Sequence, residues 1–232
     1  SECVTGYIDH IIFRNEENGY TVLALKGVED EEELTCVGTF PVITQGASIE
    51  AQGEYTRHPV YGKQFQISSF VEKMPEDSLA MERYLGPGAI KGIGAALAGR
   101  IVRRFGEDTL RIVEEEPERL SSIKGITRAK ALQMGEQFRQ AHGVRDAMAA
   151  LCGYGLSPEE ALRLWKVLGP SCLDQIQENP YCICGEGADI PFERADAIAA
   201  SLERPQDDGW RVRAGLEYVL RHNLNNGHTC IP

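Results

Sequence analysis

The chain has 232 residues, 42% of them hydrophobic and 25% charged, which is the composition of a folded globular protein and not of a disordered one. A formal net charge of −11 argues against a protein that coats DNA or an anionic membrane with its whole surface, although it leaves room for a local basic patch. The seven cysteines include no CxxC pair, the histidines show no ligand spacing, and no apolar run is long enough to cross a bilayer. We therefore expect a cytoplasmic protein with reduced thiols, no metal site and no membrane partner.

Residues 3–73 contain five short segments that are rich in β-branched and aromatic residues and are separated by turn residues. Five strands in so short a stretch are typical of a small closed barrel, most often one of the OB type, so the sequence predicts an OB-like β-barrel over 1–75. Aromatic and basic residues gather near one turn of this barrel and are candidates for contact with a single strand of nucleic acid: Arg57, His58, Tyr61, Lys63 and Phe65. Barrel aromatics more often belong to the core, so both interpretations stay open.

From Pro75 onward the pattern changes to helical periodicity broken by Gly and Pro, and the chain repeats itself. When the sequence is shifted by 63 positions, Gly92 coincides with Gly155, and many of the turn and apolar positions that follow also match. A half-period is visible in four short turns: "KGIG" at 91–94, "KGIT" at 124–127, "YGLS" at 154–157 and "ADIP" at 188–191. We predict a multidomain α+β protein in which the barrel precedes an all-α domain over 76–204, a duplicated tandem array of helix-hairpin-helix turns. Residues 205–232 are predicted to form a C-terminal helix that ends near Asn226-Gly227.

The first turn, Gly92-Ile93-Gly94, has the chemistry of a phosphate site. Its glycines permit a tight turn with outward-facing amides, and the helix that follows favours an anion at its N-terminus through its unpaired N–H groups and dipole. Such a site binds phosphate whatever the base. The alternative is that the turn merely joins two packed helices.

Charge separates the two halves of the repeat. Residues 83–145 hold twelve Lys and Arg against seven Asp and Glu, a balance of +5, whereas residues 155–203 hold three against nine, a balance of −6. We therefore predict DNA contact at the first two turns, the second weakened because Thr127 replaces a glycine. The predicted DNA-binding residues are Lys91, Gly92, Ile93, Gly94, Ala95, Arg100, Arg103, Arg104, Lys124, Gly125, Thr127, Arg128 and Lys130.

The third and fourth turns are predicted to be structural relatives that do not bind DNA. In the third turn, Ser157 and Glu160 form a predicted capping box, which puts a carboxylate where a phosphate would bind. The fourth turn carries Asp189 and Glu193, and its Pro191 lacks an amide proton.

Several segments resemble the N-terminal region of the long-form RecD-like (RecD/TraA) bacterial DNA helicases. They are "HPVYGKQFQ" in the barrel, "YLGPGAIKGIGAALAGRIVRRFGEDTLRIVEEEPERL" at 84–120, "NPY", and "DDGWRVRAGLEYVLRHNLNNGHT" near the C-terminus. The resemblance implies an accessory region that precedes a superfamily-1 motor, which consumes ATP with magnesium and moves 5′ to 3′ on single-stranded DNA in repair and recombination. The chain departs from the full family pattern because it holds no GxxxxGK[ST] loop for ATP: its one Gly-Lys pair, Gly62-Lys63, is followed by Gln64.

Two functions therefore remain open. In the first, the chain is a DNA-binding module that places a helicase on duplex, junction or single-stranded DNA without reading its sequence. In the second, it is a scaffold whose acidic half docks the helicase motor or a repair protein. In both cases we assign no catalytic residue, metal or cofactor to this chain, and we expect ATP and magnesium only in the motor.

Overall fold

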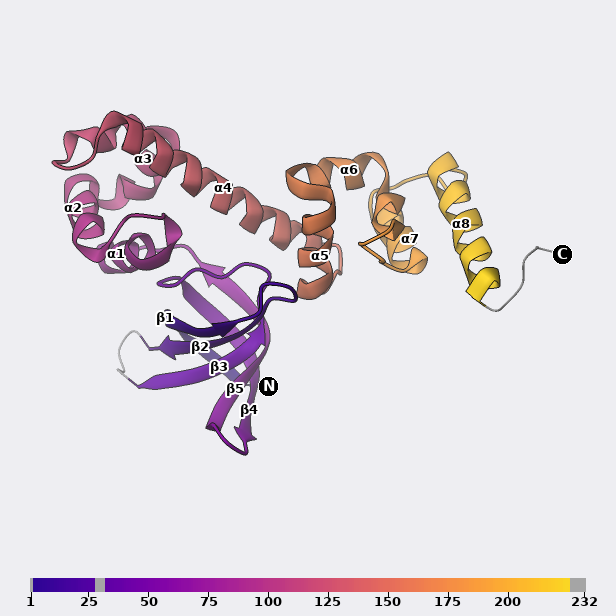
Figure 1. Ribbon diagram of the computed structural model, residues 1–232, viewed down its shortest axis with the longest axis horizontal. Coiled ribbons are helices and arrows are strands. Elements are labelled where there is room, and N and C mark those ends of the chain that lie inside the picture. Colours follow the sequence, from indigo (N-terminus) through magenta and orange to yellow (C-terminus); the bar gives the residue numbers. More distant parts are fainter. Residues whose placement is uncertain (1, 28–31, 226–232) are drawn as a thin grey trace. The chain divides into compact units, whose positions relative to one another are not determined.

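The structure is a computed structural model, and it describes residues 2–27 and 32–225 (Figure 1). The chain divides into two compact units, Ser1–Arg145 and Asp146–Pro232. The predicted helix end at Asn226-Gly227 lies outside the described residues. Within the described ranges, no helix has both the length and the apolar character needed to cross a membrane.

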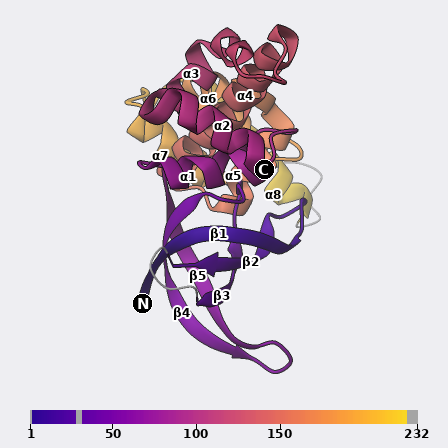
Figure 2. The same cartoon turned by 90° about the vertical axis from the view of Figure 1, so that its left-hand side faces the viewer.

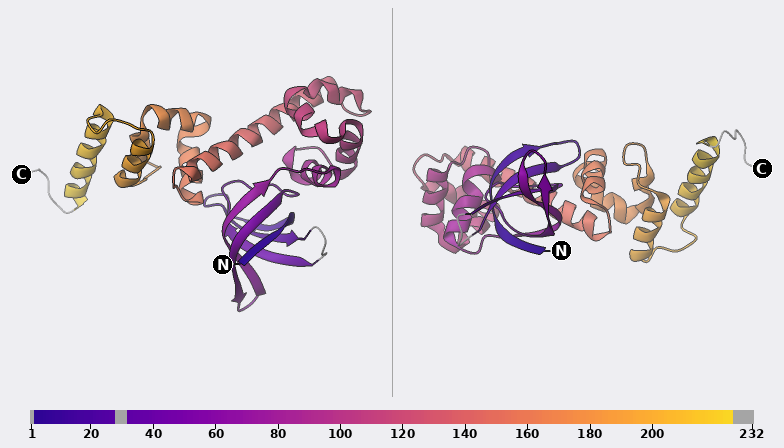
Figure 3. Two further views of the ribbon diagram at one scale, coloured as in Figure 1. Left: turned by 180° about the vertical axis from the view of Figure 1, so that it is seen from behind. Right: turned by 90° about the horizontal axis from the view of Figure 1, so that it is seen from below.

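Five strands close into a barrel in the order β1-β2-β3-β5-β4, which confirms the predicted five-stranded barrel. The strands are β1 (Glu2–Arg14), β2 (Tyr20–Lys26), β3 (Glu33–Thr39), β4 (Ser48–His58) and β5 (Gly62–Lys73). Neighbouring strands are antiparallel except β3 and β5, whose parallel pairing completes the barrel. Figures 2 and 3 show this barrel from other sides. Inward-facing side chains such as Leu23, Ile49 and Phe65 are fully buried in its core.

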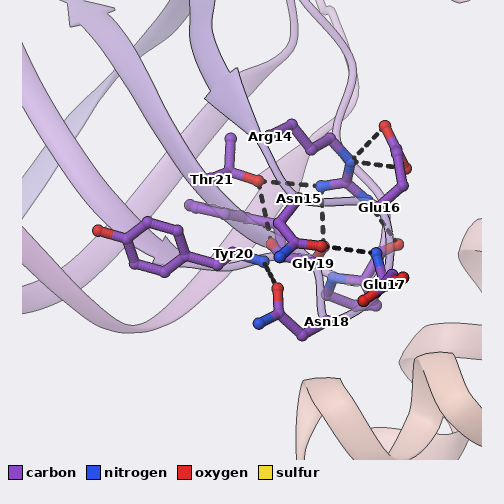
Figure 4. A network of polar contacts seen from close by, with 10 residues as sticks. Arg14, Asn15, Glu16, Glu17, Asn18, Gly19, Tyr20 and Thr21 are labelled. Atoms are coloured by element: carbon purple, nitrogen blue, oxygen red, sulfur yellow. Dashed lines mark hydrogen bonds and ion pairs between the residues drawn. The ribbon is translucent and has the colours of Figure 1, made fainter.

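The loop between β1 and β2 is held by one arginine (Figure 4). Arg14 donates from Nη1 to the hydroxyl of Thr21 and to the carbonyl of Phe40, both at 3.0 Å, and its Nε lies 3.2 Å from the carboxylate of Glu16. The guanidinium of Arg14 therefore bonds to groups at its own end of the barrel. The side chains of Glu16 and Glu17 in this loop are exposed.

All the regular elements after β5 in the described chain are helices. In order, they are α1 (Ser78–Tyr84), the π-helix η1 (Leu85–Ala89), α2 (Ala95–Phe105), η2 (Gly106–Asp108), α3 (Thr109–Glu115), η3 (Pro117–Ser122), α4 (Arg128–Gly153), α5 (Pro158–Leu168), η4 (Gly169–Ser171), α6 (Cys172–Glu178), η5 (Pro180–Cys184), α7 (Phe192–Ser201) and α8 (Gly209–Asn225). The elements α1 to η3, and α4 up to Arg145, belong to the same compact unit as the barrel. The change from strands to helices near residue 75 thus falls inside one unit.

A buried polar cluster joins α4 to the barrel within the first unit. The Nε atom of Arg145 lies 3.3 Å from the carboxylate of Glu72 on β5, and its Nη2 donates to the hydroxyl of Thr44 at 2.6 Å. The hydroxyl of Tyr84 accepts from Nη1 of the same guanidinium. Burial raises the pKa of Glu72, an effect that the neighbouring Arg145 opposes. Because these groups come from the barrel, α1 and α4, they fix the first helices against the strands.

Candidate nucleic-acid interface

The four predicted turns share one local geometry. In each, one residue has a positive φ: Gly92 (91°), Gly125 (95°), Gly155 (84°) and Asp189 (49°). The residue that follows is apolar and buried in every case: Ile93, Ile126, Leu156 and Ile190. Two residues later a helix begins, α2, α4, α5 or α7 in turn. The positive φ suits glycine, and aspartate tolerates it better than most residues, so the sequence pattern marks the turn correctly even where the fourth copy has no glycine at that position.

The helix start after the first turn has no side-chain cap. Gly94 is the N-cap of α2, and no side chain accepts a hydrogen bond from the first amides there. Its backbone angles (φ −91°, ψ 170°) suit any residue, and a Cβ placed on it would meet no atom within 4 Å. Nothing in the described part of the chain therefore requires a glycine at this position. A glycine does leave room for an outside group to approach the backbone closely.

The other three helix starts are closed to different degrees. At α4, the hydroxyl of Thr127 accepts from the amide of Lys130 at 3.2 Å. At α5, the predicted capping box is present: the amide of Glu160 donates to the Ser157 hydroxyl at 3.2 Å, and the Ser157 amide donates to the Glu160 carboxylate at 2.7 Å. At α7, the N-cap is Pro191 and the first turn carries an acidic residue. The second start thus holds a neutral cap, and the third holds the anion that was predicted there.

Two hydrogen bonds tie the first turn to the second. Gln137 on α4 accepts from the backbone amide of Lys91 at 3.1 Å, and Nη1 of Arg100 on α2 donates to the carbonyl of Lys124 at 2.9 Å. The two helix starts are therefore neighbours with a fixed spacing. Arg100 was predicted as a DNA contact, and its structural contact is with the second turn. Sequence reasoning did not find Gln137, because nothing local marks its reach across the repeat.

The predicted basic residues differ in how their charges are used. Arg128 pairs with Glu118 at 3.0 Å, and Nε of Arg103 donates to the carbonyl of Gly99 in its own helix at 3.0 Å. Of the seven predicted basic contacts, four make no side-chain hydrogen bond or ion pair within the described residues: Lys91, Arg104, Lys124 and Lys130. All except the half-buried Lys130 are exposed. Lys91, Lys124 and Lys130 lie in or close after the first two turns in the sequence, whereas Arg104 is in the last turn of α2.

In the second pair of turns, two arginines donate hydrogen bonds to backbone carbonyls of the turns themselves. Nε of Arg163 donates to the carbonyl of Ala188 at 2.8 Å. Nη1 of Arg194 donates to the carbonyl of Gly155, and its Nη2 lies 3.8 Å from the carboxylate of Glu160. Sequence reasoning missed both roles, although one signal was present: Arg163 coincides with Arg100 when the sequence is shifted by 63 positions.

Two family models match the chain, one at each end. The OB-fold domain of the ATP-dependent DNA helicase YrrC matches residues 1–75, and the HHH domain of the ATP-dependent RecD2 DNA helicase matches residues 140–230. The chain is also 28% identical, over 236 aligned positions, to the ATP-dependent RecD2 DNA helicase of Deinococcus radiodurans, an alignment that covers 99% of this chain. The two domain matches and the full-length alignment together support an N-terminal region of a RecD-like helicase. The resemblance seen in the sequence is thereby confirmed.

This RecD-like region covers 33% of the Deinococcus relative, so the chain spans about a third of the length of the curated protein it matches. The matches identify its barrel as an OB fold and relate its helical part to an HHH domain. The first two turns, with the free lysines, lie between the two matched segments.

The candidate nucleic-acid contacts on the barrel of this RecD-like region differ in exposure. Arg57, His58, Tyr61 and Lys63 are exposed at the β4–β5 end, whereas Phe65 is fully buried. The prediction that Phe65 contacts a nucleic acid is wrong, because β5 turns this side chain into the core, where its ring packs 5.1 Å from that of Tyr55.

One set of potential metal ligands occurs in the described ranges of this RecD-like chain: Asp9, His10 and Glu33 on the barrel. The ammonium of Lys26 lies 3.1 Å from the Asp9 carboxylate and 4.0 Å from that of Glu33. Hydrogen bonds from His10 and Lys26 lower the pKa of Asp9. A lysine therefore already supplies the positive charge that this carboxylate pair attracts.

Proposed function

We propose that this RecD-like region binds DNA without sequence specificity, through the first two turns, as an accessory part of an ATP-dependent helicase. The parent protein would move 5′ to 3′ on DNA in repair and recombination, in the cytoplasm. ATP and magnesium would bind in a motor outside this chain, which has no GxxxxGK[ST] loop of its own. The similarity to an ATP-dependent RecD2 DNA helicase supports this assignment.

The four turns are proposed to be helix-hairpin-helix motifs arranged as a duplicated pair. The equal φ pattern and the equivalent hydrogen bonds of Arg100 and Arg163 support this arrangement. In the first pair the helix starts and lysines face outward for DNA. In the second pair a capping carboxylate occupies the start of α5, and Tyr154 and Gly187 stand where the first pair has Lys91 and Lys124.

The observation that carries the proposal is the uncapped start of α2. The glycine at its N-cap is not needed by the fold, no carboxylate lies in its first turn, and Lys91 is exposed beside it. Helix N–H groups together with nearby lysines bind phosphate oxygens, and phosphate contacts carry no sequence information directly. A second phosphate at the Lys124 turn would follow from the fixed spacing that Arg100 provides.

A second function is favoured by α8. Its residues Val212, Leu216, Val219 and Leu220 follow helical spacing, and all four are exposed, between 45% and 58%. An apolar stripe of this kind fits a protein surface better than it fits DNA. We propose that it docks the helicase motor, and that a repair protein is the alternative partner.

The test of DNA binding is fluorescence anisotropy of the chain with duplex, single-stranded and forked DNA over a salt series. A few phosphate contacts predict a dissociation constant of roughly 10⁻⁴ to 10⁻⁶ M that is independent of sequence. Each phosphate contact contributes about 0.9 to the slope of log K against log salt on duplex DNA, so Lys91→Gln with Lys124→Gln should lower the slope by about 1.8.

The matched control is Lys166→Gln on α5, which coincides with Arg103 in the shifted sequence and is exposed. It should leave the slope unchanged. Equal effects of the two changes would refute the division between the pairs. No binding to any DNA at low salt would refute the DNA function and leave the docking function of α8.

A further inference from the structure

The β4–β5 hairpin projects beyond the barrel as a two-stranded arm, visible in Figures 1 and 2. Strand β1 pairs with β4 only up to Gly53, and β3 pairs with β5 only at Phe65 and Gln66. From Glu54 to the tip, β4 therefore pairs with β5 alone. A two-stranded hairpin of this kind is only marginally stable on its own, because it buries little apolar surface.

Two like charges face each other across this arm. Arg57 and Lys63 are directly opposite partners in the antiparallel pair and are both exposed. Like charges in this position destabilise a hairpin, and within the described residues neither side chain has a carboxylate partner. Lys63 instead places its ammonium 4.0 Å from the centre of the Tyr55 ring. In the sequence, no Asp or Glu occurs between Tyr55 and Val71.

The tip of the arm presents an aromatic ring in a fixed position. Tyr61 is 74% exposed and its neighbour Val60 is 78% exposed. The His58 ring lies 4.8 Å from the Tyr61 ring, and Nδ1 of His58 accepts from the amides of Val60 and Tyr61 at 3.1 and 3.3 Å. The His58 ring thus packs against the exposed Tyr61 ring. The cations Arg57 and Lys63 belong to the same hairpin.

We infer that this arm, Tyr55–Lys63, is a binding site for single-stranded nucleic acid. A base stacks on Tyr61, and a backbone phosphate lies between Arg57 and Lys63, where it relieves their repulsion. Bases must be unpaired to stack on a side chain, so the ligand is a single strand and not a duplex. The β1–β2 loop of the same barrel is less suited to a phosphate, because it carries the carboxylates of Glu16 and Glu17.

The inference deepens the proposed function by giving the same chain a second contact of different chemistry. It is tested with the whole chain by anisotropy on two probes, a labelled oligothymidylate of twelve nucleotides and a duplex of twelve base pairs. Tyr61→Ala should weaken binding of the single strand about tenfold and leave duplex binding unchanged. Arg57→Gln with Lys63→Gln removes the one proposed phosphate contact and should lower the salt slope for the single strand by about 0.7.

Tyr20→Ala is the matched control, since Tyr20 is another exposed barrel tyrosine, and it should change neither probe. Ultraviolet crosslinking of a bromouracil oligonucleotide should label Tyr61. Unchanged single-strand binding in Tyr61→Ala would overturn the inference. An equal loss of binding on both probes would overturn it as well. Because Lys91 and Lys124 variants act on the duplex, loss of one contact is distinguishable from loss of the other.

Discussion

Arg100 and Arg163 make equivalent hydrogen bonds in the two halves of the helical region. Arg100 donates to the carbonyl of Lys124 at 2.9 Å, and Arg163 donates to the carbonyl of Ala188 at 2.8 Å. Each acceptor immediately precedes the positive-φ residue of the following turn. Each arginine therefore holds the turn that comes next in the chain. The half that contains Arg100 is rich in basic residues, and the half that contains Arg163 is rich in acidic residues.

This equivalence predicts opposite functional outcomes for matched changes. Arg100→Met and Arg163→Met each remove a hydrogen bond from a charged donor, which costs about 1 to 2 kcal/mol of the free energy of unfolding. Hydrogen exchange should accelerate at Ile126 in the first variant and at Ile190 in the second. Only Arg100→Met should weaken duplex binding, measured by anisotropy. An equal loss of DNA affinity in Arg163→Met would show that the second pair also contacts DNA.

Exchanging the N-cap residues of α2 and α5 should separate stability from binding. Gly94 coincides with Ser157 in the shifted sequence. Gly94→Ser adds a side-chain cap, so it should raise the free energy of unfolding by a few tenths of a kcal/mol while it lowers DNA affinity severalfold. Ser157→Gly should lower stability by a similar amount and leave binding unchanged. Urea unfolding and anisotropy measure the two effects, and a Gly94→Ser protein that binds DNA normally would exclude a phosphate at this helix start.

Removing one carboxylate should strengthen DNA binding. Glu118 pairs with Arg128 at 3.0 Å, and both side chains are more than half exposed. An exposed pair contributes at most about 1 kcal/mol to folding, so Glu118→Gln should leave stability nearly unchanged. It frees a cation next to the second turn, and duplex affinity should rise about threefold at low salt and less at high salt. Asp108→Asn, which breaks the exposed pair with Arg111, is the control and should have no effect.

The buried pair of Glu72 and Arg145 predicts a pH dependence with a definite sign. Burial raises the pKa of Glu72 above its ordinary value of 4.5, and Arg145→Met removes the neighbouring charge that opposes this shift. The native state of the variant then binds the Glu72 proton more tightly than the unfolded state does. Its stability should therefore fall as the pH rises from below 4.5 through the raised pKa of Glu72.

Urea unfolding between pH 4 and pH 7 measures this effect. Breaking a largely buried pair should cost about 2 to 3 kcal/mol at neutral pH. The double variant Glu72→Gln with Arg145→Met should recover part of this loss and lack the added pH dependence. A single variant whose stability does not fall with pH relative to the double variant would mean that Glu72 is solvated.

The local elements of this protein were readable in the sequence because they depend on neighbours along the chain. The five strand segments follow β-branched and aromatic runs that end at turn residues, and each helical turn repeats a positive-φ residue followed by a buried apolar one. The capping box of Ser157 and Glu160 lies within four consecutive residues, so its spacing alone predicted it. The division of charge between the two halves is likewise a property of composition.

Contacts between distant residues were decided only by the tertiary structure. The barrel face of β5 turned Phe65 inward and left Tyr61 outside, and the fold brought Glu118 to Arg128 and Glu72 to Arg145. A periodic pattern shows that a side chain is buried or exposed, but not which partner meets it, because partners are set by how strands and helices pack after the chain closes. The sequence by itself thus determined the local geometry of the four turns. The packing determined which of the nearby cations pair with other groups of the protein.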